Sequence, residues 1–256
     1  MRLTVATYNI RNISDRYPER KPLLGAAFAS FDADIAGLQE VVFSPPRQDD
    51  FLAQQLPRRG YRAFSVESRP KGGNAILCAV GEVQAHETLD LGERRAVQRV
   101  LVVLPAQTTL WFVNTHLHDP AAEGHVRERQ AEAIVEWMAE APAADATIIT
   151  GDFNCTPLGE AYAVMAGAGF RSAYLEANGV EPVVTWPSGI QAVTMDTDGV
   201  PSCFDYIWLR GSVRAISARV AADTPPPDDP TIYPSDHFAV VTEVDVSRGV
   251  VTRERR

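Results

Sequence analysis

The stretch Thr147-Ile148-Ile149-Thr150-Gly151-Asp152-Phe153-Asn154 decides how the rest of the chain is interpreted. Its apolar, β-branched beginning predicts a buried strand, and Gly151 predicts the end of that strand. Residues two apart in an extended chain face the same way, so Asp152 and Asn154 would present a carboxylate and an amide to one point. Asp and Asn after Gly are also ordinary turn residues, so this stretch alone leaves both a turn and a functional site open.

Polar side chains with metal-binding or acid–base chemistry recur where other predicted strands end or begin. Those at the ends of apolar runs are Asn9, Glu40, His116, Asp152 and Asn154, and those at the beginnings are Asp205, Asp236 and His237. In antiparallel sheets the end of one strand lies beside the beginning of its neighbour, so these groups would gather at one rim. A single Asp or His at the rim is usually a turn residue without a further role. This number of polar side chains at compatible strand ends favours a functional site.

Composition is that of an ordinary globular protein. The 256 residues are 45% hydrophobic and 22% charged, which suits one domain over residues 1–247 with a basic, flexible tail over 248–256. The net charge of -9 disfavours avid, non-specific binding of long nucleic acids. No apolar run approaches the roughly 18 residues that span a bilayer. Three cysteines without CxxC spacing suit free thiols, and we expect a cytoplasmic protein.

Strand candidates occur in both halves of the chain, and the short connections between 83 and 114 favour antiparallel pairing there. The expected strands are 5–10, 34–41, 61–66, 75–80, 83–89, 96–104, 109–114, 147–150, 183–186, 205–209, 213–221 and 238–246. Helices are expected at 23–31, 49–56, 123–141 and 157–167. Residues 69–74 read as a flexible basic loop. Arg94-Arg95 could reach the rim, but a solvated turn is favoured. The pattern predicts an α+β domain with two sheets face to face and helices outside.

The residue types at the expected rim suit hydrolysis of a phosphate ester. Glu40 and Asp236, with Asn9, offer the hard oxygen donors that Mg²⁺ or Mn²⁺ prefers. Two histidines and two further aspartates supply proton transfer and an orienter for an imidazole. Such a reaction needs a cation for the phosphate oxygens, a base for water, and donors for developing charge.

Seven short motifs resemble those of the endonuclease/exonuclease/phosphatase superfamily, which has the DNase I-like fold. In order they are Thr7-Tyr8-Asn9-Ile10-Arg11, Leu38-Gln39-Glu40, Gly73-Asn74-Ala75-Ile76-Leu77, Asn114-Thr115-His116-Leu117, Gly151-Asp152-Phe153-Asn154, Asp205-Tyr206-Ile207 and Ser235-Asp236-His237. Each motif is weak alone, but the ordered set covers nearly the whole chain and is specific. The resemblance implies a four-layered α/β/β/α sandwich with the site between the two sheets.

The resemblance also implies roles for the metal ligands and for the groups around the attacking water. Glu40 would be the principal metal ligand, with Asn9 and Asp236 beside it, directly or through water. Asp152 would position or deprotonate the water, and Asn154 would hold that water or a phosphate oxygen.

The remaining roles concern the substrate. His237 would bind the scissile phosphate, with Asp205 fixing its tautomer and favouring its cationic form. His116 would stabilise the phosphate or assist the leaving oxygen, and Arg11 and Asn74 are candidates for contacts with substrate phosphate. The general base stays open at this point, because the aspartate beside the water and His237 can both be drawn in that role.

We therefore expect a metal-dependent hydrolase that cleaves a phosphodiester or phosphomonoester by in-line attack of an activated water. The acidic, compact chain favours a small or lipid-derived phosphoester substrate. An endonuclease or exonuclease acting on DNA or RNA is the first alternative. A non-catalytic binding module on the same fold is the second, because one fold hosts many functions.

Overall fold

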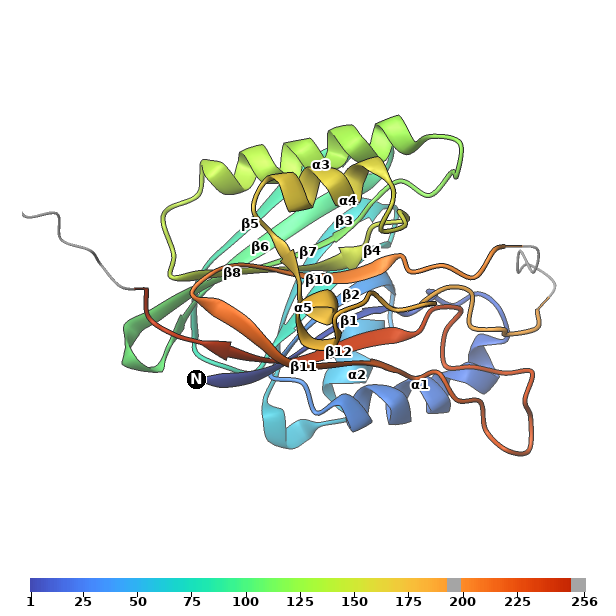
Figure 1. Cartoon of the computed structure of the whole chain (residues 1–256). Coiled ribbons are helices and arrows are strands. Elements are labelled where there is room, and N and C mark those ends of the chain that lie inside the picture. Colours follow the sequence, from blue (N-terminus) through green and yellow to red (C-terminus); the bar gives the residue numbers. More distant parts are fainter. Residues whose placement is uncertain (193–198, 250–256) are drawn as a thin grey trace, which may run out of the picture.

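Two six-stranded β-sheets lie face to face at the centre of the computed structural model, and helices cover their outer faces (Figure 1). The structure describes residues 1–192 and 199–249. This is the α/β/β/α sandwich that the ordered motifs imply, so the expected fold is confirmed.

The first sheet, sheet A, is built from both ends of the chain. In order across the sheet its strands are β11 (Val213–Ala221), β12 (Ala239–Val246), β1 (Arg2–Asn9), β2 (Ile35–Val42), β4 (Gly72–Cys78) and β3 (Arg62–Arg69). Only β1 and β2 pair in parallel, and helix α1 (Tyr17–Phe31) connects them. Pro18 fits the first turn of α1, where its missing N–H is not needed. Helix α2 (Gln48–Ala53) and the short helix η1 (Pro57–Arg59) follow β2.

The second sheet, sheet B, repeats this plan. Its strands in order are β5 (Glu82–Gly92), β6 (Arg95–Leu104), β7 (Thr108–His116), β8 (Ala146–Asp152), β10 (Asp205–Gly211) and β9 (Arg171–Ser172). The short helix η2 (Pro105–Gln107) turns the chain from β6 into β7. Strands β7 and β8 are parallel, with helix α3 (Gly124–Ala139) between them. Helices α4 (Glu160–Gly167) and α5 (Ala173–Asn178) follow β8.

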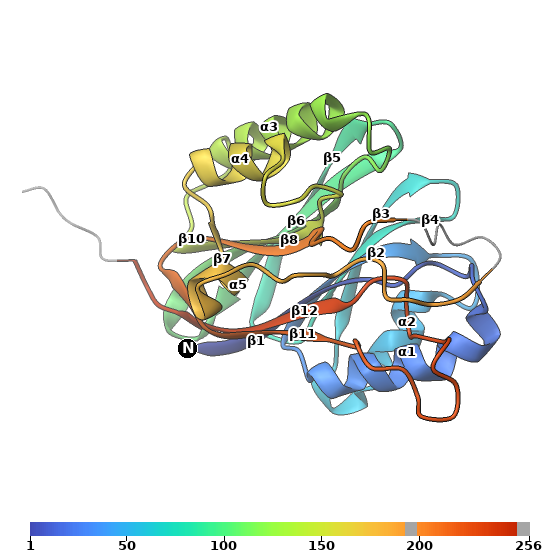
Figure 2. The ribbon, with the colours of Figure 1, turned by 45° about the vertical axis from the view of Figure 1, so that its right-hand side comes forward.

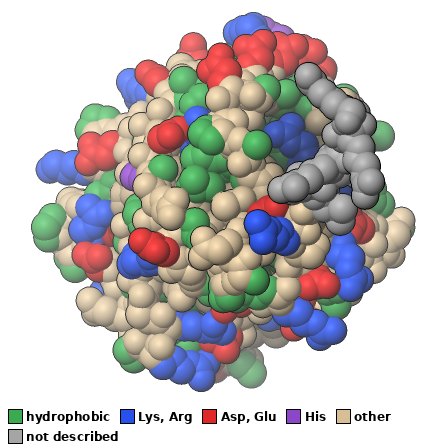
Figure 3. Space-filling view, turned by 90° about the vertical axis from the view of Figure 1, so that its left-hand side faces the viewer, with side chains coloured by type: hydrophobic (Ala, Val, Ile, Leu, Met, Phe, Trp, Pro, Cys, Tyr) green, Lys and Arg blue, Asp and Glu red, His purple; other side chains and the backbone are tan. Residues whose placement is uncertain are grey.

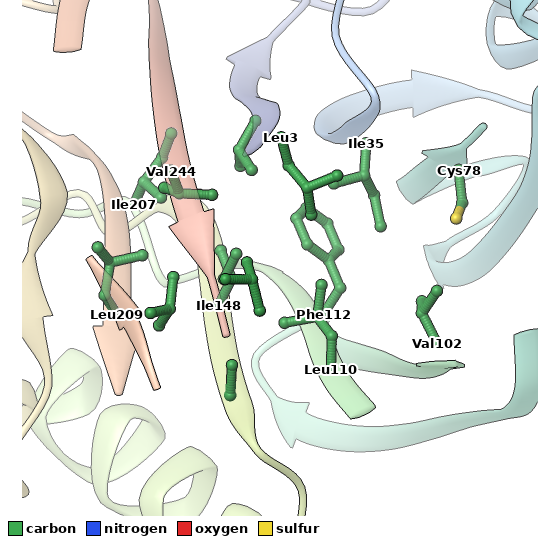
Figure 4. Close-up of a cluster of buried hydrophobic side chains, with 14 of the residues drawn as sticks. Leu3, Ile35, Cys78, Val102, Leu110, Phe112, Ile148, Ile207, Leu209 and Val244 are labelled. Atoms are coloured by element: carbon green, nitrogen blue, oxygen red, sulfur yellow. The ribbon is translucent and has the colours of Figure 1, made fainter. Parts of the chain in front are cut away.

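Three apolar clusters hold the four layers together. The middle cluster lies between the sheets, with Leu3, Ile35, Phe112 and Ile148 among its members (Figure 4). A second cluster joins α1 and α2 to sheet A, and a third joins α3 and α4 to sheet B, on opposite sides of the molecule (Figure 2). Each large apolar side chain that is fully buried contributes about 1.5–3 kcal/mol relative to exposure, so burial accounts for the stacking.

A polar bridge joins the two sheets just below the rim. The Asn114 amide on β7 donates to the carbonyl oxygens of Leu38 at 2.9 Å and Ala75 at 3.0 Å, both on sheet A. Gly37 lies at this crossing, and a Cβ there would lie 2.1 Å from Oγ1 of Thr150. The close approach of the sheets therefore requires glycine at position 37.

Strand direction places the polar residues at one rim, as the sequence predicts. The parallel strands β1 and β2 run toward Asn9 and Glu40, and the parallel strands β7 and β8 end at His116 and Asp152. Strand β10 runs the other way and begins at Asp205, whose register partner is Asp152. The carboxyl ends of parallel neighbouring strands lie at the same edge of a sheet, and an antiparallel neighbour begins at that edge.

The structure differs from the expected elements in a few places. The segment 69–74 is a hairpin rather than a loop, because Gly72, Gly73 and Asn74 belong to the buried strand β4. The expected strand at 183–186 is reduced to a single bridge between Trp186 and Ser202. The short elements β9 and α5 were not expected from the sequence.

The expected tail falls mostly outside the described residues, since the description ends at 249. Among the residues that are described, no helix combines the length and apolar character needed to cross a membrane.

Candidate active site

The rim opens into a cavity of about 620 Å³. Of the ten site residues expected from the sequence, seven line it: Arg11, Glu40, His116, Asp152, Asn154, Asp236 and His237. They come from both sheets, so the cavity exists only when the sheets are stacked. The remaining three, Asn9, Asn74 and Asp205, are buried within 2% exposure and lie behind the cavity wall.

Asp152, the last residue of β8, is the centre of the site. Its Oδ2 accepts a hydrogen bond from Nδ2 of Asn9 at 2.9 Å and lies 3.4 Å from Nε2 of His116 and 3.6 Å from Nε2 of His237. Its Oδ1 accepts from the backbone N–H of Asn154 at 2.9 Å. Burial raises the pKa of Asp152 to about 7, against the opposing effect of the His237 cation. A carboxyl with such a pKa is suited to proton transfer near neutral pH.

His237 and Asp205 form a buried pair across the two sheets. Nδ1 of His237 lies 2.9 Å from Oδ2 of Asp205. Burial lowers the pKa of His237, but the carboxylates of Asp205, Asp152 and Asp236 outweigh burial and raise it to about 10. The imidazole is therefore a cation near neutral pH, and its second N–H is directed toward the Asp152 side of the cavity.

His116 has the opposite surroundings. Its Nδ1 lies 3.1 Å from Nη1 of Arg95, and its Nε2 lies 3.1 Å from Nδ2 of Asn154. Burial and the neighbouring Arg95 cation hold the pKa of His116 well below its usual value. This imidazole is therefore neutral in the same pH range in which His237 is charged.

Glu40 and Asp236 form the acidic end of the cavity, on the sheet A side. Oε2 of Glu40 accepts from Nδ2 of Asn12 at 2.6 Å and lies 3.6 Å from Arg69. Oδ2 of Asp236 lies 3.3 Å from Nη1 of Arg11. Burial and the nearby Glu40 carboxylate both raise the pKa of Asp236. Both carboxylates lie close to an arginine guanidinium, and carboxylate oxygens are hard donors, so the pair is suited to bind a divalent cation.

A second acidic group has compact geometry. Ligand atoms of Asp152, Asp205 and His237 lie within 4.8 Å of one another. However, Nδ1 of His237 is paired with Asp205, and the neighbouring carboxylates raise the pKa of His237, which favours a protonated imidazole over a metal ligand. The group of Asp152, Asp205 and His237 is therefore better suited to acid–base chemistry. Glu40 and Asp236 are not paired with an imidazole in this way and are better suited to bind a metal.

Backbone strain marks three of the residues on the cavity wall. Glu40, Arg11 and Asn154 have φ values of 57°, 54° and 46°, which non-glycine residues seldom adopt. At Glu40 the register between β2 and β4 also shifts, as in a β-bulge, and this redirects the side chain at the end of the strand. Such strain persists where the surrounding structure holds it, and it gathers at functional sites.

Two predicted residues have contacts other than those expected. Asn74 is buried and donates to the carbonyl oxygen of Ala96 at 3.0 Å, which joins β4 to β6, and it does not reach the cavity wall. The amide of Asn9 is engaged at both ends, because Nδ2 donates to Asp152 and Oδ1 accepts from the backbone N–H of Arg11 at 3.0 Å. Asn9 therefore supports the site from behind its surface, whereas Asn74 joins the two sheets.

Two aromatic residues at the site were not singled out from the sequence, and a third residue, Arg95, was not the favoured candidate. Trp186 and Phe204 line the cavity and stack on each other, with ring centroids 5.5 Å apart and planes at 24°. Arg95, expected in a solvated turn, instead contacts His116. No periodic signal marks these residues, because Trp186 and Phe204 lie outside the named strands and Arg95 is only the first residue of β6. Of the two alternatives that the sequence leaves open for Arg94-Arg95, the position at the rim is the one that Arg95 takes.

Comparison with solved structures shows the same fold. The human Nocturnin catalytic domain, solved with a bound sulfate anion, is 19% identical and has a TM-score of 0.76, covering 96% of this chain and 95% of that one. An endonuclease/exonuclease/phosphatase from Bacteroides vulgatus is 20% identical, with a TM-score of 0.76 and coverage of 96% and 100%. D. rerio TDP2, complexed with a single-strand DNA product, is 18% identical, with a TM-score of 0.76 and coverage of 96% and 99%.

A search of curated proteins found no significant match. The model of the Endonuclease/Exonuclease/phosphatase family matches residues 6–237, a span that contains every residue of the site described above. The sequence motifs, the stacked sheets and this match agree, and the chain belongs to the endonuclease/exonuclease/phosphatase family.

Proposed function

We propose that this protein is a divalent-metal-dependent phosphoesterase that cleaves its substrate by in-line attack of water. The observation that carries the proposal is the convergence of a buried carboxyl, a cationic imidazole and a neutral imidazole on one cavity. Phosphoester hydrolysis needs little covalent chemistry from the protein, so positioning and electrostatic stabilisation are the main requirements.

Asp152 is the proposed acceptor of the proton of the attacking water. It lies in the cavity wall, and its pKa is raised to about 7 by burial, which suits a base near neutral pH. Asn9 orients this carboxyl through the 2.9 Å hydrogen bond to Oδ2. Asn154 is placed beside it to hold the water or a phosphate oxygen. We assign the base to Asp152 and not to His237, because the neighbouring carboxylates raise the pKa of His237 to about 10 and favour its protonated form.

The two imidazoles are the proposed donors to the phosphate. His237, held as a cation by Asp205, would donate to a non-bridging oxygen and offset its negative charge. His116, which is neutral, would donate to the phosphate or to the leaving oxygen. Arg11 lies at the cavity wall beside Asp236 and adds a further cation toward the substrate.

Mg²⁺ or Mn²⁺ is the proposed cofactor, held by the Glu40 and Asp236 carboxylates with the Asn9 amide oxygen behind them. Oxygen donors of this kind suit small, hard cations. Such an ion would neutralise phosphate oxygens and orient the ester for attack. The chain's own contribution is to bring the two carboxylates from β2 and from the segment before β12 to one end of the cavity.

A small or lipid-derived phosphoester is the favoured substrate class. The cavity of about 620 Å³ is in the size range of small-molecule sites, which is about 300–1,000 Å³. The net charge of -9 opposes a long polyanion. Figure 3 shows the face at which β1 begins, away from the rim where β1 ends, and acidic and basic side chains of the described residues are interspersed on it.

A nuclease is the second candidate, and one observation favours it. D. rerio TDP2, of the same fold, has been solved with a single-strand DNA product. In the present chain, Trp186 and Phe204 offer aromatic faces at the cavity wall on which a base or another flat group would stack. The substrate panel below therefore includes single-stranded DNA and an abasic duplex.

The test is a hydrolysis screen with Mg²⁺ and with Mn²⁺. The panel contains bis-p-nitrophenyl phosphate, nucleotides, inositol phosphates, phospholipid vesicles and the two DNAs, and wild type is compared with Asp152→Ala. We expect turnover by wild type that the substitution abolishes, with preference for the small or lipid substrates. Steeply salt-dependent binding and cleavage of DNA would identify a nuclease instead. If wild type and Asp152→Ala were equally inactive on every substrate, the result would favour the non-catalytic binding module over the phosphoesterase.

Two further expectations concern the whole chain. The three cysteines are buried and unpaired, which is compatible with a reducing compartment such as the cytoplasm. We also retain the assignment of residues 1–247 to one domain, since β12 ends at Val246.

A further inference from the structure

Arg95 contacts His116 on the side of the imidazole away from the cavity. Its Nη1 lies 3.1 Å from Nδ1 of His116, and its Nη2 lies 3.0 Å from Oδ1 of Asp119. The Arg95 side chain is 13% exposed, and it is not part of the cavity wall, although His116 and Asp119 are. Arg95 therefore has a fixed position behind a proposed catalytic imidazole and does not reach the substrate itself.

The chemistry of the guanidinium decides which nitrogen of His116 carries the proton. A guanidinium has five N–H donors and no acceptor, so Nδ1 of His116 can interact with Arg95 favourably only by accepting. A neutral imidazole has a single N–H, and that proton must then be on Nε2. Nε2 is the nitrogen directed at the cavity, 3.4 Å from Oδ2 of Asp152.

We propose that Arg95 is a positioning residue that holds His116 in its Nε2–H tautomer, so that His116 acts in the cavity as a hydrogen-bond donor and not as an acceptor. Asp119 anchors the guanidinium from the other side. This proposal rests on the proposed phosphoesterase function, because the donor matters only where negative charge develops on a phosphate or a leaving oxygen.

A competing arrangement is weaker. Nδ2 of Asn154 lies 3.1 Å from Nε2 of His116, and an acceptor at Nε2 would give this amide a hydrogen bond. That choice would move the proton to Nδ1, where it would face the Arg95 cation. The same amide nitrogen already has an acceptor in the carbonyl oxygen of Leu117 at 3.1 Å. A charge-assisted hydrogen bond is about twice as strong as a neutral one, so the contact with Arg95 prevails.

The direct measurement is the tautomer of His116. Long-range ¹⁵N correlation spectra of histidine-labelled, EDTA-treated protein at pH 8 distinguish a protonated Nε2 from a protonated Nδ1. We expect the Nε2–H pattern in wild type and in Arg95→Lys, which retains a cation and a donor. Arg95→Met removes both, and we expect Nδ1–H to become populated. The neighbouring, exposed Arg94 gives the matched control, and Arg94→Met should leave the wild-type pattern.

Activity supplies the second readout. Arg95→Met should lower kcat by about 10- to 100-fold, as for other residues that orient a functional group from behind, while KM changes little. Arg95→Lys should recover most of kcat, and Arg94→Met should be equal to wild type. A purely structural role of Arg95 would not produce the change of tautomer together with a fall confined to kcat.

The two proposals fail in different ways. An Nδ1–H pattern in wild type, or an unchanged pattern in Arg95→Met, would overturn the role of Arg95 even if the protein hydrolyses phosphoesters. A correct pattern that responds to Arg95→Met, in a protein inactive on every substrate, would overturn the phosphoesterase function and leave the control of the tautomer standing.

Discussion

The two imidazoles of the site differ in charge although they face the same carboxyl. Nε2 of His116 and Nε2 of His237 lie 3.4 Å and 3.6 Å from Oδ2 of Asp152. His237 has three carboxylates around it, which raise its pKa to about 10, whereas burial and Arg95 lower the pKa of His116. The two imidazoles share Asp152, so the difference in charge comes from the neighbours that they do not share, which are Asp205 and Asp236 for His237 and Arg95 for His116.

The difference follows the division of the site between the sheets. His237 precedes β12 of sheet A, where Glu40 and Asp236 also lie, and it reaches across to Asp205. His116 ends β7 of sheet B, beside the first residue of β6, which is Arg95. One imidazole is therefore placed as a cation near the acidic end and the other as a neutral donor.

Removal of the divalent cation should have the largest effect. The ion is expected to supply several kcal/mol of transition-state stabilisation, so activity after EDTA treatment should fall by about a thousandfold or more. Added Mg²⁺ or Mn²⁺ should restore it, and Glu40→Gln should need a higher metal concentration. Undiminished hydrolysis in EDTA would mean that the two imidazoles act without an acidic, metal-holding end.

Asp152→Asn removes the carboxyl that both imidazoles face. Loss of a general base typically costs about 10²- to 10⁴-fold, and we expect kcat to fall within that range. The near-isosteric amide should leave the fold intact, which circular dichroism would check. Asp245→Asn on β12, a carboxylate paired with the N-terminus at 3.2 Å, is the matched control and should keep full activity. A mild defect in Asp152→Asn would assign the base elsewhere.

Asp205→Asn tests the cationic imidazole alone. The amide can still accept a hydrogen bond from Nδ1 of His237, but it supplies no negative charge. We expect a loss of about 10- to 100-fold in kcat, the usual effect of altering a group that orients and charges a catalytic residue. Steady-state kinetics at one pH would measure it. A loss as large as that of Asp152→Asn would place Asp205 in direct contact with the reaction.

Gly37→Ala perturbs the packing that keeps the two imidazoles opposite each other. The added Cβ would lie 2.1 Å from Oγ1 of Thr150 and 2.5 Å from Oδ1 of Asn114, so the sheets must move apart. Overpacking of this kind costs about 1–3 kcal/mol of unfolding free energy, measurable by urea denaturation. Gly167→Ala, at the end of α4 with open space around it, is the control. Equal stability of both variants would contradict the close approach of the sheets.

The smallest expected effect concerns the pH dependence of stability. The folded-state pKa of His116 lies below the usual 6.5, so the unfolded chain binds the proton more readily and stability falls as pH drops below about 6.5. The slope for one proton is at most about 1.4 kcal/mol per pH unit. His116→Gln should lose this part of the acid sensitivity when Tm is measured in EDTA at pH 8, 6.5 and 5.5. His125→Gln, an exposed residue of α3, should behave as wild type.

Much of the site could be predicted because its residues stand at strand ends. Apolar runs indicate strands, and the side chain at the end of a run must leave the core, so Asp152 and His116 could be assigned to one rim before any coordinates. The same reasoning failed for Asn74. Its segment looked like a flexible loop, but two consecutive glycines were part of a buried strand, and the amide faces the opposite sheet.

Arg95 illustrates the other limit. Two consecutive arginines in a turn look equivalent in sequence, yet Arg94 is exposed and Arg95 contacts His116. Strand β6 begins at Arg95, so the register of β6 against β7 places this side chain beside the end of β7. Register and turn geometry depend on the pairing of distant segments, which a local pattern does not contain.

The order of polar groups along the chain, the strand at whose end each one stands, and the chemical capacity to hold a cation and move a proton all follow from the amino acids themselves. The tertiary structure alone decided which ring is charged. Protonation depends on the electrostatic environment within a few ångströms, and for His116 and His237 that environment comes from residues far away in the sequence. Asp205 reaches His237 only when the two sheets stack, and Arg95 reaches His116 only when β6 pairs with β7 in sheet B.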